Sequence, residues 1–493
     1  MRVLFIHKGY ESLGIQSLSA YAESLGHQVD LIFDCSPFSS NMGLNNLVLD
    51  RLLGISEQKL ESRIAEQIQT HSPDIIGFSL MTVHYQWALR VARKIKERFS
   101  IPIVFGGVHI TAVPEVALEE DCVDAAVVGE GYGALADLLE SVEHGKFTRH
   151  DIKNVWFRTK DGIVKNPLRP LEDIDKIPLP DKDLFNNKLD IFYKRYILNT
   201  SSLCPFRCAY CFNRVCLDLY GVKNPVQKRS IDNIIEELQN ARSAHQIDVV
   251  QFFDDIFTLD KEWLEQFLPR YRKEINLPYT CYAHFNCIDE DRIKLLKETG
   301  CRNAQFGLQS WNEQYRNEVI RRHYSNTRIY ETAQLCKKHG LNFSTDYILE
   351  WPWDDEPEMK DAARHFINIK PNSVSCFLLS YFPGIEITSY ALEKGCITRE
   401  RIEAINHGFQ GSADELSDNP LHSKYQIFFE QIPSMPRWLA LEILEHDLIK
   451  YVPQNVFLRQ AMLILAELLR NRTRLAYFLK YIIRYLLSRS KLP

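Results

Sequence analysis

Residues 200–213, TSSLCPFRCAYCFN, set three cysteines in the spacing C-x3-C-x2-C, the most informative pattern of the chain. Cys204, Cys208 and Cys211 can bind a four-iron cluster and leave one iron open for another ligand. A structural zinc ion usually takes four ligands from two Cys or Cys/His pairs, and no second pair lies nearby, so zinc is the weaker alternative. Structural cysteines grouped by chance are weaker still. The spacing therefore predicts an iron–sulfur cluster.

Short apolar runs alternate with helical patterns around these cysteines. The segment 230–245, for example, has helical spacing and opens with Ser230 and Asp232 as candidate caps. The predicted strands are YILNTSS (196–202), VVQFF (249–253), YTCYAH (279–284), NAQFGL (303–308), FSTDYIL (343–349) and SVSCFLL (373–379). The cysteine loop follows the first strand, at the carboxyl end where barrel enzymes keep their chemistry.

The N-terminal part, residues 1–145, shows a similar alternation. Its apolar runs are VLFI (3–6), VDLIF (29–33), IIGFS (75–79), PIVFGG (102–107) and AAVVG (125–129). Five such runs with amphipathic segments between them predict a Rossmann-like parallel sheet covered by helices. No G-x-G-x-x-G follows the first strand, so a dinucleotide is not the favoured ligand.

Two further segments complete the predicted organisation. Residues 146–195 read as a connector with a hairpin turned at Asp161-Gly162. Residues 391–493 read as mainly helical, and the tail from Arg470 onward carries seven Lys/Arg and no acid. That tail can lie as an amphipathic helix on an anionic membrane or pack on the barrel with its cations in solvent, and both alternatives stay open.

Composition limits the class of protein. The chain has 493 residues, enough for two or three domains, with a hydrophobic fraction of 45% and a charged fraction of 25%, as in ordinary globular proteins. A net charge of −5 gives no general attraction to nucleic acid. The other cysteines are scattered singly, no apolar run reaches the ~18–20 residues that span a bilayer, and the N-terminus lacks a signal peptide pattern. We therefore expect a cytoplasmic protein, with peripheral membrane contact through the tail as a hypothesis.

The cysteine triplet, with Tyr210 before its last cysteine and an apolar strand leading into it, resembles the signature of radical S-adenosylmethionine (SAM) enzymes. The resemblance implies the fold class: α/β, with an N-terminal Rossmann-like parallel sheet domain, a partial (β/α)6 TIM-type radical SAM barrel over residues 196–390, and a mainly helical C-terminal extension. It also implies a [4Fe-4S] cluster, SAM bound to its open iron and cleaved to a deoxyadenosyl radical, and a reducing donor such as flavodoxin or ferredoxin.

Several further positions match the SAM-contacting elements of the same family. Besides Tyr210, Asp254 and Asp255 form the acidic pair found after the second strand in this branch, although two such carboxylates can also merely cap the next helix. In QFGLQS (305–310), Gln309 stands where the family usually has glutamate, and Ser310 follows it. These residues are the predicted SAM contacts.

Three positions after the fifth strand and one after the triplet each have two alternative roles. Glu350, Trp351 and Trp353 can line a substrate pocket or simply cover a core edge, which is the commoner use of loop aromatics. Cys216 is better read as an ordinary loop thiol than as a catalytic or accessory group.

The N-terminal part resembles cobalamin-binding domains. Ser79 opens an S-L-M element, and Gly106 and Gly107 form a double glycine, both of which occur in those domains near the nucleotide tail of the cofactor. The segment VVGEGY (127–132) resembles enzymes in which a cobalamin-binding domain is fused to the radical SAM barrel.

The usual Asp-x-His-x-x-Gly loop, whose histidine binds cobalt from below, is missing. After the second predicted strand the chain has FDCSPFSSNMG, without a histidine. The resemblance therefore implies cobalamin held without that ligand, or a domain that has lost it, and we favour retained binding. His84 and His109 can approach a corrin, but isolated histidines are more often packing residues.

The leading functional hypothesis is cobalamin-dependent methylation of an unactivated carbon in a small-molecule or lipid-like substrate. A radical route suits such a carbon because it has no lone pair with which to attack SAM. The alternatives are a cyclisation, oxidation or rearrangement by the same cofactors, and, from another class, a non-catalytic iron–sulfur or corrinoid-binding sensor.

Overall fold

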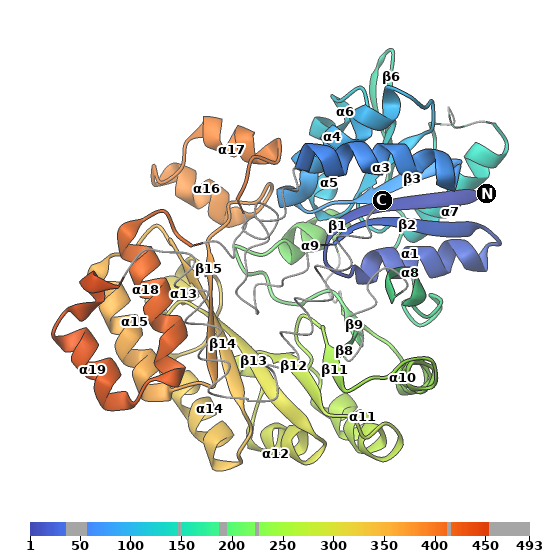
Figure 1. Ribbon diagram of the computed structural model, residues 1–493. Coiled ribbons are helices and arrows are strands. Elements are labelled where there is room, and N and C mark those ends of the chain that lie inside the picture. Colours follow the sequence, from blue (N-terminus) through green and yellow to red (C-terminus); the bar gives the residue numbers. More distant parts are fainter. Residues whose placement is uncertain are drawn as a thin grey trace.

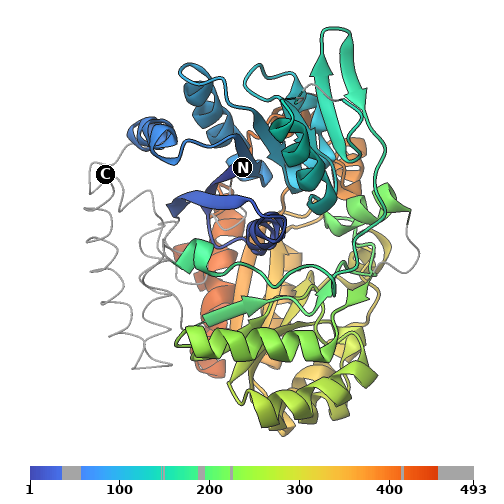
Figure 2. The ribbon, with the colours of Figure 1, turned by 90° about the vertical axis from the view of Figure 1, so that its right-hand side faces the viewer.

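The computed structural model describes residues 1–35, 57–145, 147, 150–186, 195–221, 226–411 and 416–452. An N-terminal α/β unit lies at the upper right of Figure 1 and a barrel at the lower left. Seen from the side in Figure 2, the N-terminal unit lies above the barrel.

A seven-stranded sheet in the order β2-β1-β3-β4-β5-β6-β7 forms the N-terminal unit. The strands are β1 (Arg2–Gly9), β2 (Gln28–Cys35), β3 (Ile75–Ser79), β4 (Ile103–Gly106), β5 (Ala125–Val127), β6 (Val155–Thr159) and β7 (Gly162–Lys165). The first five are parallel in the flavodoxin-like order 2-1-3-4-5, which confirms the predicted doubly wound sheet. The predicted hairpin, β6–β7, adds two antiparallel strands beside β5.

Helices cover both faces of this sheet, which is why its strands are apolar without interruption. Leu4 and Ile6 of β1 belong to one core, whereas Val3 and Phe5 belong to the other. The first core contains residues of α3 (Glu57–His71), α4 (Tyr85–Lys96), α5 (Val108–Ala112) and α6 (Pro114–Leu118), and the second residues of α1 (Leu13–Ser24), α7 (Tyr132–Glu143) and α8 (Asp183–Asn186).

The barrel consists of six parallel strands in the order β15-β14-β13-β12-β11-β8, with β8 and β15 at its two edges. These strands are β8 (Arg195–Leu198), β11 (Val249–Phe252), β12 (Tyr279–Ala283), β13 (Cys301–Gln309), β14 (Phe343–Leu349) and β15 (Ser373–Leu378). Between β8 and β11, the short strands β9 (Ser201–Ser202) and β10 (Gln227–Lys228) pair antiparallel and enclose the cysteine loop and the helix after it. All six predicted barrel strands are confirmed.

The helices that alternate with these strands pack on the outer face of the barrel. They are α10 (Ile231–Ala244), α11 (Lys261–Glu274), α12 (Glu290–Glu298), α14 (Asn326–Lys338) and α15 (Glu356–Ile369), whereas α9 (Asn213–Tyr220) and α13 (Glu313–Glu318) follow the carboxyl ends of strands and lie outside this outer core. Ser230 caps α10 by accepting a hydrogen bond from the Asn233 N–H, as predicted, while Asp232 lies in its first turn. Alternate strand residues, such as Phe252 and Phe306, join the outer core, so the residues between them face the inside of the barrel.

The described C-terminal part is helical, as predicted. It contains α16 (Glu386–Glu393), α17 (Arg399–Asn406), α18 (Pro420–Gln431) and α19 (Arg437–Glu445), of which α18 packs on β15. The basic tail lies outside the described residues. Across the described part of the chain, no helix combines the length and the apolarity needed to cross a membrane.

The carboxyl ends of the two sets of strands face each other. Tyr220, at the end of α9, receives a hydrogen bond from the backbone N–H of Glu130, just beyond β5, at 2.7 Å. The Gln86 side chain of α4 donates to the His407 carbonyl beyond α17 at 2.6 Å. Ser417, further along the same segment, donates a hydrogen bond to Glu350, which follows β14. Loops from both carboxyl edges are therefore held together.

Candidate active site between the barrel and the N-terminal sheet

The three predicted cluster cysteines lie in the loop between β9 and α9. Burial raises the pKa of the Cys204 and Cys211 thiols to about 12, and the neighbouring cysteines raise each further by charge repulsion. A bound metal cluster carries positive charge that favours the thiolate forms, so three cysteines in one loop fit the donor set of an iron–sulfur cluster.

A single metal ion fits these cysteines less well. Among the described residues, no three His, Cys, Asp or Glu side chains are grouped closely enough to hold one ion. Thiolates that bind different irons of one cluster need not converge on a point. The geometry therefore gives no support to the zinc alternative. Cys216 lies on α9, half-buried, with its pKa raised to about 11 by burial and by Asp255.

Arg322, which the sequence analysis missed, brings a positive charge to the cysteine loop. Its guanidinium lies 3.7 Å from the Cys208 sulfur and 3.4 Å from the Tyr210 hydroxyl, and its Nε donates to the Gly307 carbonyl at 3.0 Å. Burial opposes its charge, but Tyr210, Tyr324 and Cys208 together raise its pKa. In the sequence, the adjacent arginines Arg321 and Arg322 could have suggested a cation near the site. The fold is needed to tell them apart, because Arg321 forms an ion pair with Glu386 instead.

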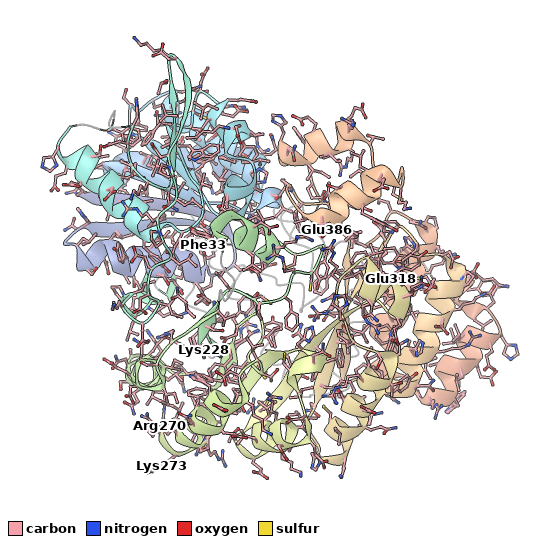
Figure 3. All side chains as sticks on the ribbon, turned by 180° about the vertical axis from the view of Figure 1, so that it is seen from behind. Phe33, Lys228, Arg270, Lys273, Glu318 and Glu386 are labelled. Atoms are coloured by element: carbon pink, nitrogen blue, oxygen red, sulfur yellow. The ribbon has the colours of Figure 1, made fainter. Side chains whose placement is uncertain are left out.

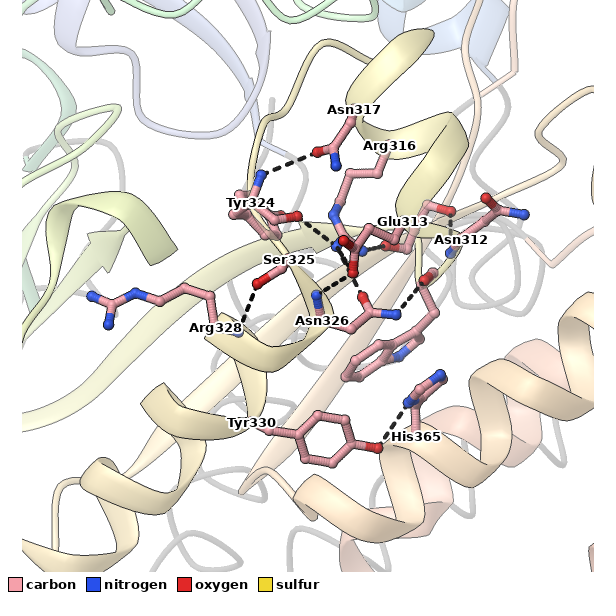
Figure 4. Close-up of polar contacts among 12 residues, drawn as sticks. Asn312, Glu313, Arg316, Asn317, Tyr324, Ser325, Asn326, Arg328, Tyr330 and His365 are labelled. Atoms are coloured by element: carbon pink, nitrogen blue, oxygen red, sulfur yellow. Dashed lines mark hydrogen bonds and ion pairs between the residues drawn. The ribbon is translucent and has the colours of Figure 1, made fainter.

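A buried arginine, Arg316, fixes the segment that carries Arg322 (Figure 4). Fully buried, it donates to the carbonyls of Ser310 and Tyr324, both at 2.8 Å, and to the Asn326 side chain at 2.9 Å. The Tyr324 hydroxyl in turn donates to the Gly307 carbonyl at 3.0 Å. These hydrogen bonds fix the backbone at the end of β13, where two predicted SAM contacts lie.

The two predicted acidic residues after β11 have different surroundings. Asp254 is buried and accepts hydrogen bonds from the Thr200 N–H at 3.1 Å, the Thr200 hydroxyl at 2.7 Å and the Ser201 hydroxyl at 2.5 Å. Asp255 is exposed, yet desolvation by surrounding protein raises its pKa, and its charge acts on Cys204 and Cys211. Asp254 therefore holds the strand leading to the cysteines, whereas Asp255 lies beside them and accepts a hydrogen bond from the Asn213 side chain.

Gln309 and Ser310 end β13 on the same rim. Gln309 is buried and has a positive φ of 71°, and its carbonyl accepts a hydrogen bond from the Trp351 indole at 3.2 Å. The Trp351 ring stacks on Trp353 with centroids 5.1 Å apart and meets Tyr210 edge-on at 5.9 Å. These contacts place the two tryptophans as packing for the rim.

Glu350 links the barrel to the C-terminal part, and two polar side chains that the sequence did not indicate, Asp346 and Gln305, lie inside the barrel. Glu350 accepts a hydrogen bond from Ser417 and lies 3.9 Å from His422 Nδ1, so it ties β14 to the C-terminal part. Inside the barrel, Asp346 of β14 accepts a hydrogen bond from the Gln305 side chain at 2.7 Å, and burial raises its pKa to about 7. A carboxyl group so placed is suited to accept hydrogen bonds from a bound ligand.

The predicted cobalamin residues lie at the carboxyl ends of β3 and β4. Ser79 ends β3, and Gly106 and Gly107 end β4 and lead into α5. Gly107 has φ +95°, and a Cβ there would lie 2.5 Å from the Leu80 nitrogen. The glycine thus lets the turns after β3 and β4 pack together, a role that the sequence analysis did not assign.

The same edge of the sheet offers an apolar surface. Tyr10, Met81 and Val108 follow β1, β3 and β4 and are 44%, 46% and 44% exposed. The order of the strands reverses between β1 and β3, which is where open α/β sheets bind ligands. Large apolar side chains exposed at that point fit the broad, mainly apolar face of a corrin.

His84 and His109 both pack against neighbouring residues of the N-terminal unit. His109 is buried against Tyr85 and contacts the Thr82 hydroxyl at 3.1 Å. His84 lies over Gly9, where a Cβ would be 3.0 Å from its ring. Burial lowers the pKa of each to about 4, so both are neutral at pH 7. Most of the FDCSPFSSNMG segment lies outside the described residues.

Two family models match the two units. A model of the B12 binding domain matches residues 6–139, and a model of the Radical SAM superfamily matches residues 198–365. The chain is therefore a radical SAM enzyme with an N-terminal B12-binding domain, which uses a [4Fe-4S] cluster, SAM and cobalamin with a small-molecule substrate and a reductant. This assignment as an enzyme replaces the sensor alternative.

Among known proteins, the chain is similar to the "Uncharacterized methyltransferase PH0819" of Pyrococcus horikoshii, with 27% identity over 69% of this chain and 74% of the relative. It is 24% identical to the anaerobic magnesium-protoporphyrin IX monomethyl ester cyclase of Rubrivivax gelatinosus, over 71% of this chain and 62% of that one. The fold resembles the radical SAM methyltransferase TsrM of Kitasatospora setae with cobalamin and a [4Fe-4S] cluster bound, with TM-score 0.61, 15% identity, and coverage of 80% and 75%.

Proposed function

We propose that this protein is a cobalamin-dependent radical SAM methyltransferase that methylates an unactivated carbon of a small molecule. One observation carries the proposal. The cysteine loop of the barrel, where the cluster and SAM would bind, lies opposite the carboxyl ends of β1, β3 and β4, where cobalamin would bind. A substrate between them would meet both. The methyltransferase names of PH0819 and TsrM support the same reaction.

The proposed roles follow the placement of each side chain. Cys204, Cys208 and Cys211 bind the cluster. Tyr210, Asp255, Gln309 and Ser310 contact SAM, while Asp254 positions the cysteine loop instead of touching SAM itself. Ser79, Gly106 and Gly107 shape the cobalamin edge, without a histidine from the usual motif.

When bound, the cluster and SAM supply a carbon-centred radical that removes a substrate hydrogen, and methylcobalamin supplies the methyl group. The chain's own residues prepare this space. Arg322 places a cation beside the Cys208 sulfur and the Tyr210 hydroxyl, where it could bind the carboxylate of SAM, and Asp255 could bind the ammonium group. Tyr10, Met81 and Val108 exclude water from the opposite side, which protects a reactive radical.

The test uses full-length protein expressed with cobalamin, reconstituted anaerobically with iron and sulfide and passed through gel filtration. We expect about one corrinoid per chain to be retained, and deuterated methyl groups from methyl-labelled SAM to appear in small molecules of a cell extract. Retained cofactors with SAM cleavage but no label in any product would refute methyl transfer.

One alternative has an observation of its own, the similarity to the Rubrivivax cyclase. It predicts a product that differs from its substrate in hydrogen or oxygen content and not by a methyl group, so the same mass spectra separate the two reactions.

We further propose that the chain divides into domains at residues 1–145, 146–195, 196–390 and 391–493 and that the protein is cytoplasmic. We also propose that its C-terminal tail contacts membranes, and in that case the substrate would be lipid-like.

A further inference from the structure

His284 lies directly against the cysteine loop, although no motif pointed to it. It follows β12 at the carboxyl end of the barrel and is 1% exposed. Its ring stacks on Phe206, with centroids 4.3 Å apart and planes 11° from parallel. Phe206 lies between Cys204 and Cys208, so this contact places the imidazole beside the predicted cluster.

The proton of the neutral His284 ring is on Nε2. The backbone N–H of Asn286 donates to His284 Nδ1 at 3.1 Å, as the first bond of the short turn Phe285–Cys287. Nδ1 must therefore carry a lone pair, which leaves the proton on the other nitrogen. The Asn286 side chain is itself held by the His323 carbonyl at 2.7 Å.

Within the described part of the chain, this Nε2–H has no protein acceptor. The atom is buried and has no hydrogen-bond partner among the described residues. A buried donor left without a partner costs about 1–3 kcal/mol, so native proteins almost always supply one. Its surroundings are Phe206, Tyr324 and Arg322, and Arg322 also lies against Cys208. The site therefore has room for an acceptor supplied by a bound group.

We propose that His284 donates a hydrogen bond from Nε2 to a sulfur atom of the cluster and thereby raises its reduction potential. Reduction adds negative charge to the cluster, and an N–H donor stabilises the more negative state. His284 is thus a residue that tunes the electron transfer to SAM. The proposal depends on cluster binding and not on methyl transfer.

The test compares reconstituted full-length wild-type protein with His284→Phe, which keeps the stacking on Phe206 and removes the donor. In wild-type protein labelled with ¹⁵N-histidine, pulsed electron paramagnetic resonance of the reduced cluster should show coupling to one histidine nitrogen. In His284→Phe the coupling should disappear, and the equilibrium constant for reduction should fall about tenfold, which equals about 59 mV for one electron.

A matched control is His365→Phe. His365 also stacks on an aromatic ring, that of Trp311, but both of its nitrogens have protein partners, Tyr330 and Asp361. This variant should keep both the coupling and the potential. Absence of histidine coupling in a fully loaded wild-type cluster overturns the proposal, and it would mean that the N–H faces the Tyr324 ring. If His284→Phe does not hold a cluster, the labelled wild-type measurement still decides, and neither result depends on whether methyl groups are transferred.

Discussion

At the scale of single residues, the cysteine triplet carries the most chemistry. Cys208→Ser should lose most of its cluster because a neutral hydroxyl cannot replace a thiolate beside Arg322. Iron and sulfide content and the visible absorbance of the reconstituted protein measure this. Cys216→Ser is the control, since Cys216 lies outside the triplet, and it should retain a full cluster. Equal cluster loss in both variants would contradict the assignment.

Asp254 and Asp255 are adjacent in the sequence but should respond differently to the same change. Asp254→Asn turns an amide group toward the Thr200 N–H and should destabilise the protein by about 1–3 kcal/mol, because buried donors lose their acceptor. Thermal unfolding measures this loss. Asp255→Asn should leave the unfolding temperature almost unchanged and weaken SAM binding, as measured by equilibrium dialysis with the cluster loaded. Similar unfolding temperatures for both variants would contradict the division of roles.

Glu130 gives a pH-dependent prediction. Burial raises its pKa from 4.5 to about 7, and it accepts a hydrogen bond from the Glu172 N–H at 2.7 Å. The folded protein therefore holds this proton more tightly than the unfolded chain, so the stability contributed by protonation is lost as the pH rises through 7. Glu130→Gln should raise the unfolding temperature relative to wild type at pH 8 and not at pH 5. A difference that does not change with pH would contradict the prediction.

At the scale of elements, α9 joins the cysteine loop to the N-terminal unit. Asn213 at its start bonds to Asp255, and Arg214 pairs with Glu386 at the start of α16, which Figure 3 labels beside α9. At its end, Tyr220 lies on Gly129, where a Cβ would overlap the hydroxyl oxygen and lie 3.0 Å from the ring. Gly129 of the VVGEGY segment thus serves the contact between the two units.

Tyr220→Phe should weaken that contact, because the Glu130 N–H loses its acceptor. We expect the cluster and SAM cleavage to remain while deoxyadenosine formed per methyl group transferred rises about threefold or more. Liquid chromatography with mass spectrometry measures both products. The control is Tyr451→Phe, at a tyrosine that is 72% exposed. An unchanged product ratio in Tyr220→Phe would argue against a role for α9 in aligning the two sites.

At the scale of the whole molecule, we expect cobalamin to bind against the apolar surface at the carboxyl edge of the N-terminal sheet. Met81→Asp places a charge against a corrin face and should reduce retained corrinoid at least tenfold, because burying a carboxylate without a partner is costly. The ratio of cobalt to protein after gel filtration measures this. Leu25→Asp, at another exposed apolar residue of the same unit, should retain a full complement. Equal retention by both variants would place cobalamin elsewhere.

Apolar periodicity and short-range motifs are local properties of a chain, so the two sheets, the cysteine triplet and the glycine pair after β4 can be recognised without the fold. The sequence also predicted the β6–β7 hairpin from its turn. The surroundings of each polar residue, in contrast, had to come from the folded chain. Arg322 and His284 are far from the cysteines in the sequence, and Asp254 and Asp255 carry the same side chain. Their roles depend on burial and on neighbours from other strands, which exist only once the parallel strands bring distant loops to one edge.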